Sequence, residues 1–362
     1  MSSGSNAKRL PSARGQKPPL RPLPLLRRVG APIATDRDWL DAAARLALRA
    51  RPLARPNPGV GALVVAGGRV VGRGWTAAGG RPHAEAVALA QAGSAARGAT
   101  LYVTLEPCAH DSARGPACAE LIVAARLARV VVGVIDPDPR TAGAGIARMR
   151  AAGIVVDLLA SDAAVESLAG YLVRAAHGRP HVTLKLAVSL DGAIATAAGE
   201  SRWITGPEAR AHVHARRALA DAILVGGATW RADSPRLDVR LPGLEGRSPA
   251  PVVLSRQPLA EVRTIAAPAD IAGLDGVSWL YLEGGAGAAA AFLAADLVDR
   301  LDLYRAPILL GAGRRALGDI GLGALADAHG RWQAVERRVL GKDDYAAYRR
   351  LSTKEQPCSP AS

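Results

Sequence analysis

The chain has 362 residues, a length that predicts two domains, each large enough to bury its own core. Its residues are 49% apolar and 22% charged, with no run of 18 apolar residues, which predicts a globular protein and excludes a membrane-spanning helix. Three cysteines are too few for a disulfide framework and favour a reducing compartment, so we expect a cytoplasmic protein.

The net charge of +14 is basic enough to raise the question of nucleic-acid binding. Half of this excess lies in residues 1–35, which hold seven basic residues and no acidic one. The remaining basic residues are nearly all arginines, and they are not interleaved with the aromatic residues that single strands need for stacking. We therefore expect no nucleic-acid partner, no membrane partner and an acidic small molecule as substrate.

Residues 1–35 also contain six prolines and little periodicity, so we expect a disordered tail. They lack the central apolar segment of a secretory signal. An organelle transit peptide is an alternative, although the prolines oppose the amphipathic helix that such peptides form. Residues 351–362 are expected to form a second disordered tail.

Ordered structure is expected to begin at Asp36, which can cap a helix that continues to Leu48. Two short apolar runs then flank Gly67-Gly68, which predicts a β-hairpin over 62–75. The later elements of this first domain, residues 36–177, are helices at 83–92, from Pro116, at 146–152 and at 161–176, and strands at 100–105, 130–135 and 154–158. This alternation of strands and helices predicts an α/β fold.

Gly178-Arg179-Pro180 reads as a linker, and a second α/β domain is expected over 178–350. Its predicted elements are strands at 181–188, 221–226, 252–254 and 279–282, and helices at 207–220 and 288–295. Glu283-Gly284-Gly285 opens a glycine-rich segment between the last of these strands and the last helix. Such a segment can cradle a phosphate, although most glycine-rich turns bind nothing.

The segment from His83 to Cys118 contains the strongest chemical signal. It contains His-Ala-Glu ending at Glu85, then Pro-Cys ending at Cys108, then Cys118. One imidazole and two thiolates leave the fourth position of a tetrahedral zinc ion open for water, as in catalytic zinc sites. Glu85 would carry protons between that water and a leaving group. His-x-Glu followed by Pro-Cys and a second cysteine is the signature of zinc-dependent nucleobase deaminases.

The structural alternative is that His83 caps or packs a helix and that the two cysteines are buried apolar thiols. Two of only three cysteines follow a His-x-Glu, however, and this favours the metal site. His110 could replace His83 as a ligand on spacing alone, but the neighbouring carboxylate favours His83. Cys358 lies in the polar tail and is expected to be spare.

Lys185 is the only lysine between Lys17 and Lys342, in a chain that otherwise uses arginine for positive charge. A compact ammonium that can donate a proton is a role that a planar guanidinium does not fill. The alternative is the chance survival of one lysine on a strand. We expect a functional role.

Together these motifs resemble the bifunctional deaminase/reductase family of riboflavin biosynthesis, over about 36–349. In the first domain the matching motifs are Pro56-Asn57-Pro58-x-Val60-Gly61, His83-Ala84-Glu85, Thr104-Leu105-Glu106-Pro107-Cys108 and Cys118. In the second domain they are Lys185-Leu186-Ala187-x-Ser189-Leu190-Asp191-Gly192, Gly199-Glu200-Ser201-x-Trp203-Ile204-Thr205, Asp233-x-Pro235-Arg236-Leu237-x-Val239-Arg240 and Glu283-Gly284-Gly285. The resemblance implies a cytidine-deaminase-like α/β/α domain followed by a dihydrofolate-reductase-like α/β domain.

The resemblance implies two steps: a diaminopyrimidinone carrying a phosphoribosylamino group loses ammonia, and its ribosyl chain is then reduced to ribityl with NADPH. It implies that His83, Cys108 and Cys118 hold one zinc ion, that Glu85 shuttles protons, and that Lys185 and Glu283 lie beside the reacting ribose carbon. Our hypothesis is that Lys185 donates to the developing hydroxyl. The implied NADPH-binding residues are Ala187, Trp203, Thr229, Asp233, Gly285, Ala286 and Gly287. The implied substrate-binding residues are Asn57, Ser201, Thr205, Arg217, Leu237, Arg240 and Glu283. A homo-oligomer, either dimer or tetramer, is also implied.

The sequence departs from the family pattern in two places. The spacing from Cys108 to Cys118 is one residue longer than usual, and we expect the intervening loop to absorb it. The segment between Ser255 and Tyr281 is short, and Arg256 replaces a small hydroxyl residue, so a deaminase with an inactive reductase domain is an alternative.

Two other hypotheses are a tRNA adenosine deaminase, which lacks a second domain of this kind, and a non-catalytic scaffold, which would have lost a zinc ligand or Glu85.

Overall fold

The computed structural model describes Met1, residues 34–110 and residues 114–351. Most of the two predicted tails, Cys358 and residues 111–113 of the lengthened loop before Cys118 therefore lie outside the described residues. Within the part that is described, no helix combines the length and the apolarity needed to cross a membrane.

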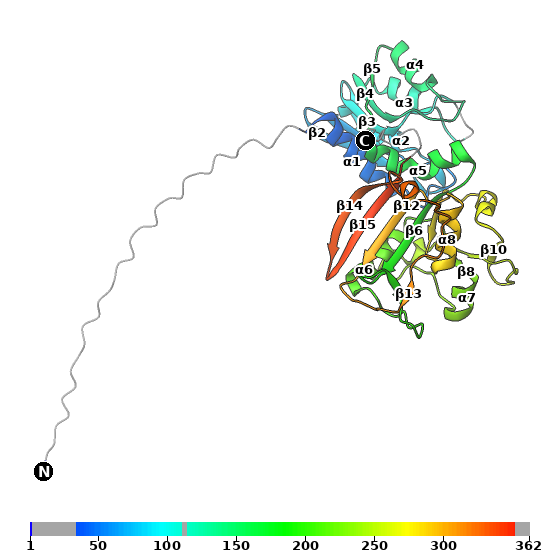
Figure 1. Ribbon diagram of the computed structural model, residues 1–362. Helices are drawn as coiled ribbons and strands as arrows, with labels where there is room; N and C mark the ends of the chain where they lie inside the picture. Colours follow the sequence, from blue (N-terminus) through cyan, green and yellow to red (C-terminus); the bar gives the residue numbers. More distant parts are fainter. Residues whose placement is uncertain (2–33, 111–113, 352–362) are drawn as a thin grey trace, which may run out of the picture. The chain divides into compact units, whose positions relative to one another are not determined.

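The first domain is built on a five-stranded mixed sheet in the order β2-β1-β3-β4-β5 (Figure 1). Its strands are β1 (Gly61–Ala66), β2 (Arg69–Trp75), β3 (Thr100–Leu105), β4 (Arg129–Val134) and β5 (Val155–Leu158). The predicted hairpin is present as the antiparallel pair β1–β2. Strands β3, β4 and β5 are parallel, so their carboxyl ends lie at the same edge of the sheet.

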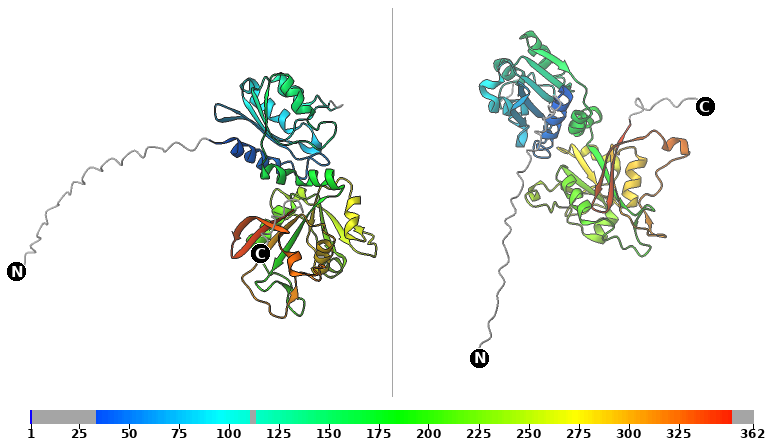
Figure 2. Two further views of the ribbon diagram at one scale, coloured as in Figure 1. Left: turned by 45° about the horizontal axis from the view of Figure 1, so that its top comes forward. Right: turned by 90° about the vertical axis from the view of Figure 1, so that its left-hand side faces the viewer.

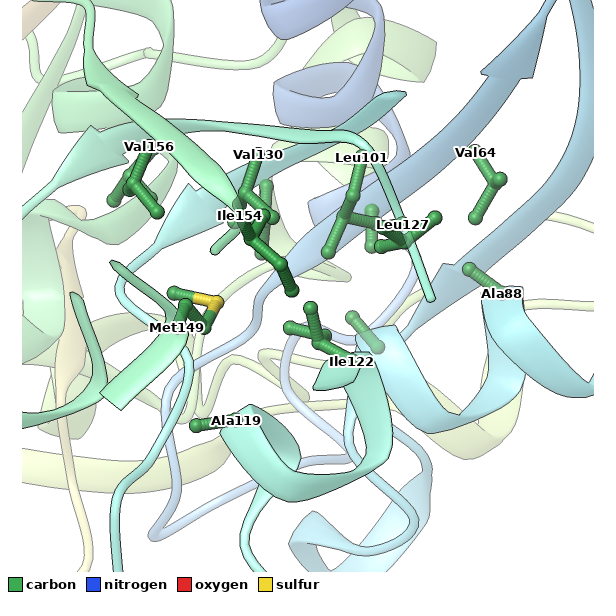
Figure 3. Packing of buried hydrophobic residues seen from close by; sticks show 14 of the residues in the cluster. Val64, Ala88, Leu101, Ala119, Ile122, Leu127, Val130, Met149, Ile154 and Val156 are labelled. Carbon is green, nitrogen blue, oxygen red and sulfur yellow. The ribbon is translucent and has the colours of Figure 1, made fainter. Parts of the chain in front are cut away.

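Helices cover both faces of this sheet because the side chains of its strands alternate between two apolar clusters. Helices α2 (Ala84–Ala92), α3 (Cys118–Ala124) and α4 (Ala144–Ala151) lie on one face, where Ile122 and Met149 pack against Leu101 and Val130 (Figure 3). Helix α1 (Asp36–Ala47) covers the other face through contacts with Leu63, Tyr102 and Val131, and α5 (Asp162–His177) lies beside it (Figure 2). The layers are α/β/α.

The predicted cap of the first helix is wrong by one residue. Thr35 is the N-cap: its hydroxyl accepts from the backbone N–H of Asp38, and the Asp38 carboxylate accepts from the backbone N–H of Thr35 at 2.8 Å. This reciprocal capping box satisfies two backbone donors that a cap at Asp36 would leave without partners. Asp36 instead lies in the first turn and accepts hydrogen bonds from Arg129.

The second domain is built on an eight-stranded sheet in the order β10-β9-β8-β11-β6-β12-β15-β14. Its strands are β6 (His181–Val188), β8 (Ala222–Gly226), β9 (Ala250–Leu254), β10 (Arg263–Ile265), β11 (Trp279–Leu282), β12 (Arg300–Arg305), β14 (Trp332–Leu340) and β15 (Asp343–Arg350). The first six are parallel, whereas β15 and β14 extend one edge as an antiparallel hairpin (Figure 1). A separate pair joins β7 (Ala193–Ala195) to β13 (Arg314–Arg315).

The helices of this domain also lie on both faces of the sheet. Helix α6 (Pro207–Arg217) packs on one face through Ala209 and Val213, and α8 (Ala286–Ala294) packs on the other through Ala289 and Phe292. Helix α8 begins two residues earlier than predicted, and the short helix α7 (Gly227–Asp233) was not predicted. The short segment after Ser255 forms β10 and a 3-10 turn whose Ile271 and Leu274 are buried in the core.

The strands after residue 300 were not predicted, and they carry a buried ionic cluster around Asp302. Its carboxylate is fully buried and accepts from Arg300 Nε at 2.7 Å, from Arg216 Nε at 3.1 Å and from the Tyr345 hydroxyl at 3.1 Å. Burial by itself raises the pKa of Asp302, but the charges of Arg216 and Arg300 hold it below the usual value of 3.8.

We expect Asp302→Ala to lower the free energy of unfolding by about 3–5 kcal/mol, because it takes the carboxylate partner from Arg216 and one of three carboxylate partners from the buried Arg300. Urea denaturation measures the effect. The matched control is Asp344→Ala, which removes a 59% exposed partner of Arg305 and should cost less than about 1 kcal/mol. Since the folded pKa of Asp302 is depressed, its contribution persists above pH 3.8 and is lost as the pH falls through the folded pKa. Equal losses in both variants would contradict this.

Candidate functional site

The first candidate site lies at the carboxyl end of β3, where two helices begin. His83 is the N-cap of α2, and Glu85 lies in its first turn. Cys108 follows β3, and Cys118 is the first residue of α3. The structure therefore brings together the four residues that the sequence motif selected. Helix α3 begins two residues after the Pro116 predicted to open it.

The donor atoms of His83, Cys108 and Cys118 all lie within 4.8 Å of one another. His83 Nδ1 is 3.3 Å from Cys118 Sγ and 3.6 Å from Cys108 Sγ. A tetrahedral zinc ion with ligand bonds of about 2.0–2.3 Å holds its ligands about 3.5 Å apart. The distances and the donor types fit zinc. Among the described residues, no other group of three such side chains has this arrangement.

His110, the competing ligand on spacing alone, lies outside this cluster. Its Nδ1 is 3.4 Å from the Thr141 hydroxyl, so the imidazole points toward the loop before α4. The spatial arrangement thus selects His83 over His110.

The electrostatics of the cluster favour a thiolate beside the imidazole. A hydrogen bond from Cys118 is the largest cause of a lowered pKa of Cys108, to about 4, and the hydrogen bond to His83 acts in the same direction. The hydrogen bond to Cys108 in turn raises the pKa of His83. The Cys118 backbone N–H also donates to Cys108 Sγ at 3.3 Å. A positive imidazole and an amide donor both stabilise negative charge on sulfur.

Glu85 is 3% exposed and lies beside the Cys118 thiol. Burial raises the pKa of its carboxyl to about 7, which suits a group that accepts and returns a proton near neutral pH. The first turn of α2 comes this close to the sheet because Gly74 of β2 lies under it. A Cβ at Gly74 would overlap the carbonyl oxygen of Ala84.

Glu106 supports the site in a way that the motif did not reveal. Its buried carboxylate accepts from the backbone N–H groups of Gly143 at 2.9 Å, Ile146 at 3.1 Å and Asp136 at 3.3 Å. These bonds tie the end of β3 to the loop and first turn of α4, so Cys108 stands on a fixed backbone. The sequence carried one sign of this supporting role: Glu106 is an acidic residue that directly follows the apolar strand β3.

The second candidate site lies at the carboxyl ends of the neighbouring strands β6 and β11. Lys185 lies on β6, and its Nζ is 3.7 Å from Oε2 of Glu283, which directly follows β11. Arg217, the last residue of α6, donates to both Glu283 oxygens, at 2.6 Å from Nε and 3.0 Å from Nη2. Burial by itself raises the pKa of Glu283, but Lys185 and Arg217 hold it below its usual value. The carboxylate is therefore ionised between two cations.

The predicted substrate-binding residues of the second domain surround α6. Thr205 is buried just before the helix, and Ser201 is exposed in the preceding loop. Arg240 is half-exposed and lies 3.5 Å from Asp238, the residue after buried Leu237. Arg217 Nη1 also donates to the Asp238 carbonyl oxygen at 2.9 Å, which leaves two guanidinium hydrogens for another acceptor.

Asn57, the predicted substrate residue of the first domain, lies in the loop before β1. Its side-chain nitrogen donates to the carbonyl oxygen of Gly80 at 3.3 Å. A Cβ at Gly80 would overlap the Asn57 side chain, and Gly80 has φ of +86°, so glycine is required there on two grounds. Asn57 is thereby held close to the segment that leads into His83.

The predicted cofactor residues lie at the start of α8, on α7, on β6 and in the loop before α6. Gly285 is the N-cap of α8, no side chain caps its backbone N–H groups, and Thr229 of α7 lies next to Gly285. Uncapped N–H groups at the start of a helix that follows a parallel strand fit a pyrophosphate. Asp233 ends α7 and lies 3.7 Å from Arg202, while Trp203 is 66% exposed. Ala187 is on β6, two residues after Lys185.

Two family models match the chain. One is described as "Cytidine and deoxycytidylate deaminase zinc-binding region" and matches residues 33–134. The other is described as "RibD C-terminal domain" and matches residues 180–268 and 270–343. Together with the two sheets, they confirm the predicted fold class and the order of its two domains.

Known proteins match nearly the whole chain. It is 38% identical over 361 residues to riboflavin biosynthesis protein RibD of Escherichia coli, with 85% of this chain and 97% of the relative covered. It is 40% identical over 306 residues to RibD of Mycobacterium tuberculosis, with 80% and 89% covered.

Solved structures agree with these relatives. Acinetobacter baumannii RibD is 34% identical, with a TM-score of 0.75 and 88% of this chain and 99% of that chain covered. A diaminohydroxyphosphoribosylaminopyrimidine deaminase/5-amino-6-(5-phosphoribosylamino)uracil reductase of Thermotoga maritima is 28% identical, with a TM-score of 0.77 and 87% and 99% covered. With both sites in place and both domains matched in order, the chain belongs to the RibD family of riboflavin biosynthesis proteins.

Proposed function

We propose that this chain catalyses two successive steps of riboflavin biosynthesis. The first is the hydrolytic deamination of 2,5-diamino-6-(5-phosphoribosylamino)pyrimidin-4(3H)-one, and the second is the NADPH-dependent reduction of the ribosyl side chain to ribityl. The proposal rests chiefly on one observation: a single chain holds a His/Cys/Cys cluster with a buried glutamate and, in a second domain, a Lys185–Glu283 pair beside a glycine-opened helix.

In the deaminase domain, His83, Cys108 and Cys118 would hold one zinc ion, which supplies Lewis-acid activation of water at neutral pH. Glu85 takes the proton from the attacking water and delivers it to the leaving amine. Its burial beside Cys118 keeps this proton transfer away from bulk water. Asn57 contacts the substrate from the loop before β1.

In the reductase domain, bound NADPH supplies the hydride. Lys185 donates a proton to the oxygen that becomes the new hydroxyl, and ionised Glu283, 3.7 Å from Lys185 Nζ, orients the side chain. The cofactor contacts are Ala187, Trp203, Thr229, Asp233, Gly285, Ala286 and Gly287. The substrate contacts are Ser201, Thr205, Arg217, Leu237, Arg240 and Glu283, with the arginines suited to the phosphate.

The wider predictions are those of a biosynthetic enzyme. A phosphorylated small molecule is the substrate, while a cytoplasmic location, a homo-oligomer and the lack of a nucleic-acid partner remain predictions. The alternative, a deaminase with an inactive reductase domain, rested on the short segment after Ser255. That segment is folded into β10 and the core, which favours a working second domain.

An assay on the full chain tests the proposal. The purified protein is given the diaminopyrimidinone substrate, and ammonia release and NADPH oxidation are followed separately. Both signals are expected. Ammonia without NADPH oxidation would support the deaminase-only alternative. The absence of both signals would contradict the proposed function as a whole.

Removing the metal should separate the two activities. Dialysis against a zinc chelator, or Cys118→Ser, is expected to abolish ammonia release, because two remaining donors bind zinc much more weakly than three. NADPH oxidation on pre-deaminated substrate should remain within about twofold, since the reductase uses no zinc ligand. Metal analysis of both proteins should show loss of one zinc per chain. Retained zinc and retained ammonia release in Cys118→Ser would contradict the ligand set.

A further inference from the structure

The turn of the β14–β15 hairpin meets the start of α6 through one buried carboxylate. Asp343, the first residue of β15, is completely buried, and its Oδ2 accepts from the backbone N–H of Gly206 at 2.6 Å. Gly206 is the N-cap of α6 and has no side chain that could cap the helix itself. The two residues are 137 positions apart in sequence, so the contact is purely tertiary.

Close packing of the hairpin turn on the helix fixes this contact. Gly341 has φ of +64°, and a Cβ on it would overlap the carboxylate of Glu208 in the first turn of α6. The next residues of the hairpin continue the packing, because Tyr345 lies in the same buried cluster as Ala209 and Val213 of α6. The hairpin turn and the start of α6 are therefore closely packed against each other.

The residues near this anchor include a proposed contact of the substrate, Thr205, and a proposed contact of NADPH, Trp203. Thr205 directly precedes Gly206, and its carbonyl oxygen accepts from Arg210 Nη1 at 2.6 Å. The Arg210 guanidinium lies over the Trp203 ring, 4.8 Å from its centroid. Helix α6 then ends at Arg217, which orients Glu283. One anchor at Gly206 thus sets the loop before the helix and the start of the helix itself.

The chemistry of Asp343 argues against a role in stability alone. A buried carboxylate costs free energy unless its oxygens are hydrogen-bonded. Oδ1 of Asp343 is buried and has no hydrogen-bond partner among the described residues. The other oxygen, Oδ2, accepts from the backbone N–H of Gly206. Asp302, in contrast, is surrounded by two arginines and a tyrosine.

We propose that Asp343 is a positioning residue of the reductase: by accepting from Gly206 at the start of α6, it holds the adjacent Thr205 where Thr205 contacts the phosphate of the substrate. This inference rests on the proposed reductase function. It assigns a role in substrate affinity to the C-terminal hairpin, which itself carries none of the predicted substrate or cofactor residues. Asp343 does not touch the reacting atoms, so it should affect KM for the pyrimidine more than kcat.

The test compares Asp343→Ala and Asp343→Asn with Asp344→Ala in the full-length protein. Asp344 is the matched control, because it is an adjacent acidic residue but its side chain is 59% exposed and pairs only with the exposed Arg305. Reductase kcat and KM are measured on pre-deaminated substrate, with the Ki of inorganic phosphate, the Kd of NADPH and the rate of ammonia release. Hydrogen exchange of the Gly206 amide reports the contact directly.

We expect Asp343→Ala to raise KM and the Ki of phosphate by about tenfold, the effect of losing one charge-assisted hydrogen bond. Faster exchange at Gly206 should accompany this, with kcat within about threefold, a smaller change in NADPH affinity than in KM, and unchanged ammonia release. Asp343→Asn keeps an acceptor oxygen and should largely restore KM. Should Asp343→Ala fold poorly, Asp343→Ser replaces it, because a serine hydroxyl cannot reach Gly206.

Three outcomes would overturn the proposal: KM unchanged in Asp343→Ala, KM raised equally in Asp343→Asn, or NADPH affinity lost in parallel with KM, as a general loss of structure would cause. A wild-type enzyme that releases ammonia but oxidises no NADPH would instead contradict the reductase function. In that case the Ki of phosphate is replaced by phosphate binding measured by calorimetry, which still tests the anchor.

Discussion

Glu85→Gln is expected to lower ammonia release by about 10²–10⁴-fold, the contribution of a positioned general acid-base group. Glutamine has the size of glutamate but cannot take a proton from water and return it to the leaving amine. Glu85 is 3% exposed, so bulk water has little access to replace it. The measurement is the initial rate of ammonia release at saturating substrate.

Two controls make this result specific. The zinc content of Glu85→Gln should remain at one per chain, because Glu85 does not belong to the His83–Cys108–Cys118 donor set. NADPH oxidation on pre-deaminated substrate should also be unchanged. A variant that keeps its zinc and still releases ammonia at the wild-type rate would show that another group carries the proton.

Lys185→Ala is expected to lower reductase kcat by about 10²–10⁴-fold while ammonia release stays at the wild-type rate. The variant removes the ammonium that lies 3.7 Å from Glu283 and leaves that carboxylate paired with Arg217 alone. Lys185→Arg should not restore activity, because a guanidinium is larger, planar and does not give up its proton. The rate of NADPH oxidation on pre-deaminated substrate measures the effect.

A double-mutant cycle with Glu283→Gln tests whether the pair acts as a unit. Residues that share one function have strongly non-additive effects, so the double variant should be little slower than Lys185→Ala. NADPH affinity should be unchanged in all three variants. Normal turnover in Lys185→Ala would contradict proton donation by Lys185. Fully additive effects of the two substitutions on kcat would mean that Glu283 acts independently of Lys185.

The sequence alone predicted most of the first domain and its metal site. Strand and helix periodicity gave the order of the elements, since each strand face or helix stripe must meet an apolar layer. The zinc residues could be found because each follows a recognisable local feature: a helix start for His83 and Glu85, a strand end for Cys108, and a helix start for Cys118. Local features of this kind do not depend on distant residues.

The sequence analysis did not predict the strands after residue 300. For β14 the reason is its exposure, because a mostly exposed strand has only a weak apolar pattern. The exact cap of α1 also needed coordinates, since Thr35 and Asp36 are both good caps and only the reciprocal bonds with Asp38 distinguish them. The choice of His83 over His110 was likewise decided by distance.

By itself, the sequence determined the two-domain α/β organisation, the family and the donor types of the zinc site, because these depend on periodicity and short motifs. Only the tertiary structure decided which distant residues support the chemistry. Arg217 reaches Glu283 across 66 residues, and Asp343 reaches Gly206 across 137. Contacts of this kind join elements whose separation in the chain carries no pattern, and they form only when α6 packs on the face of the sheet that β15 and β11 share.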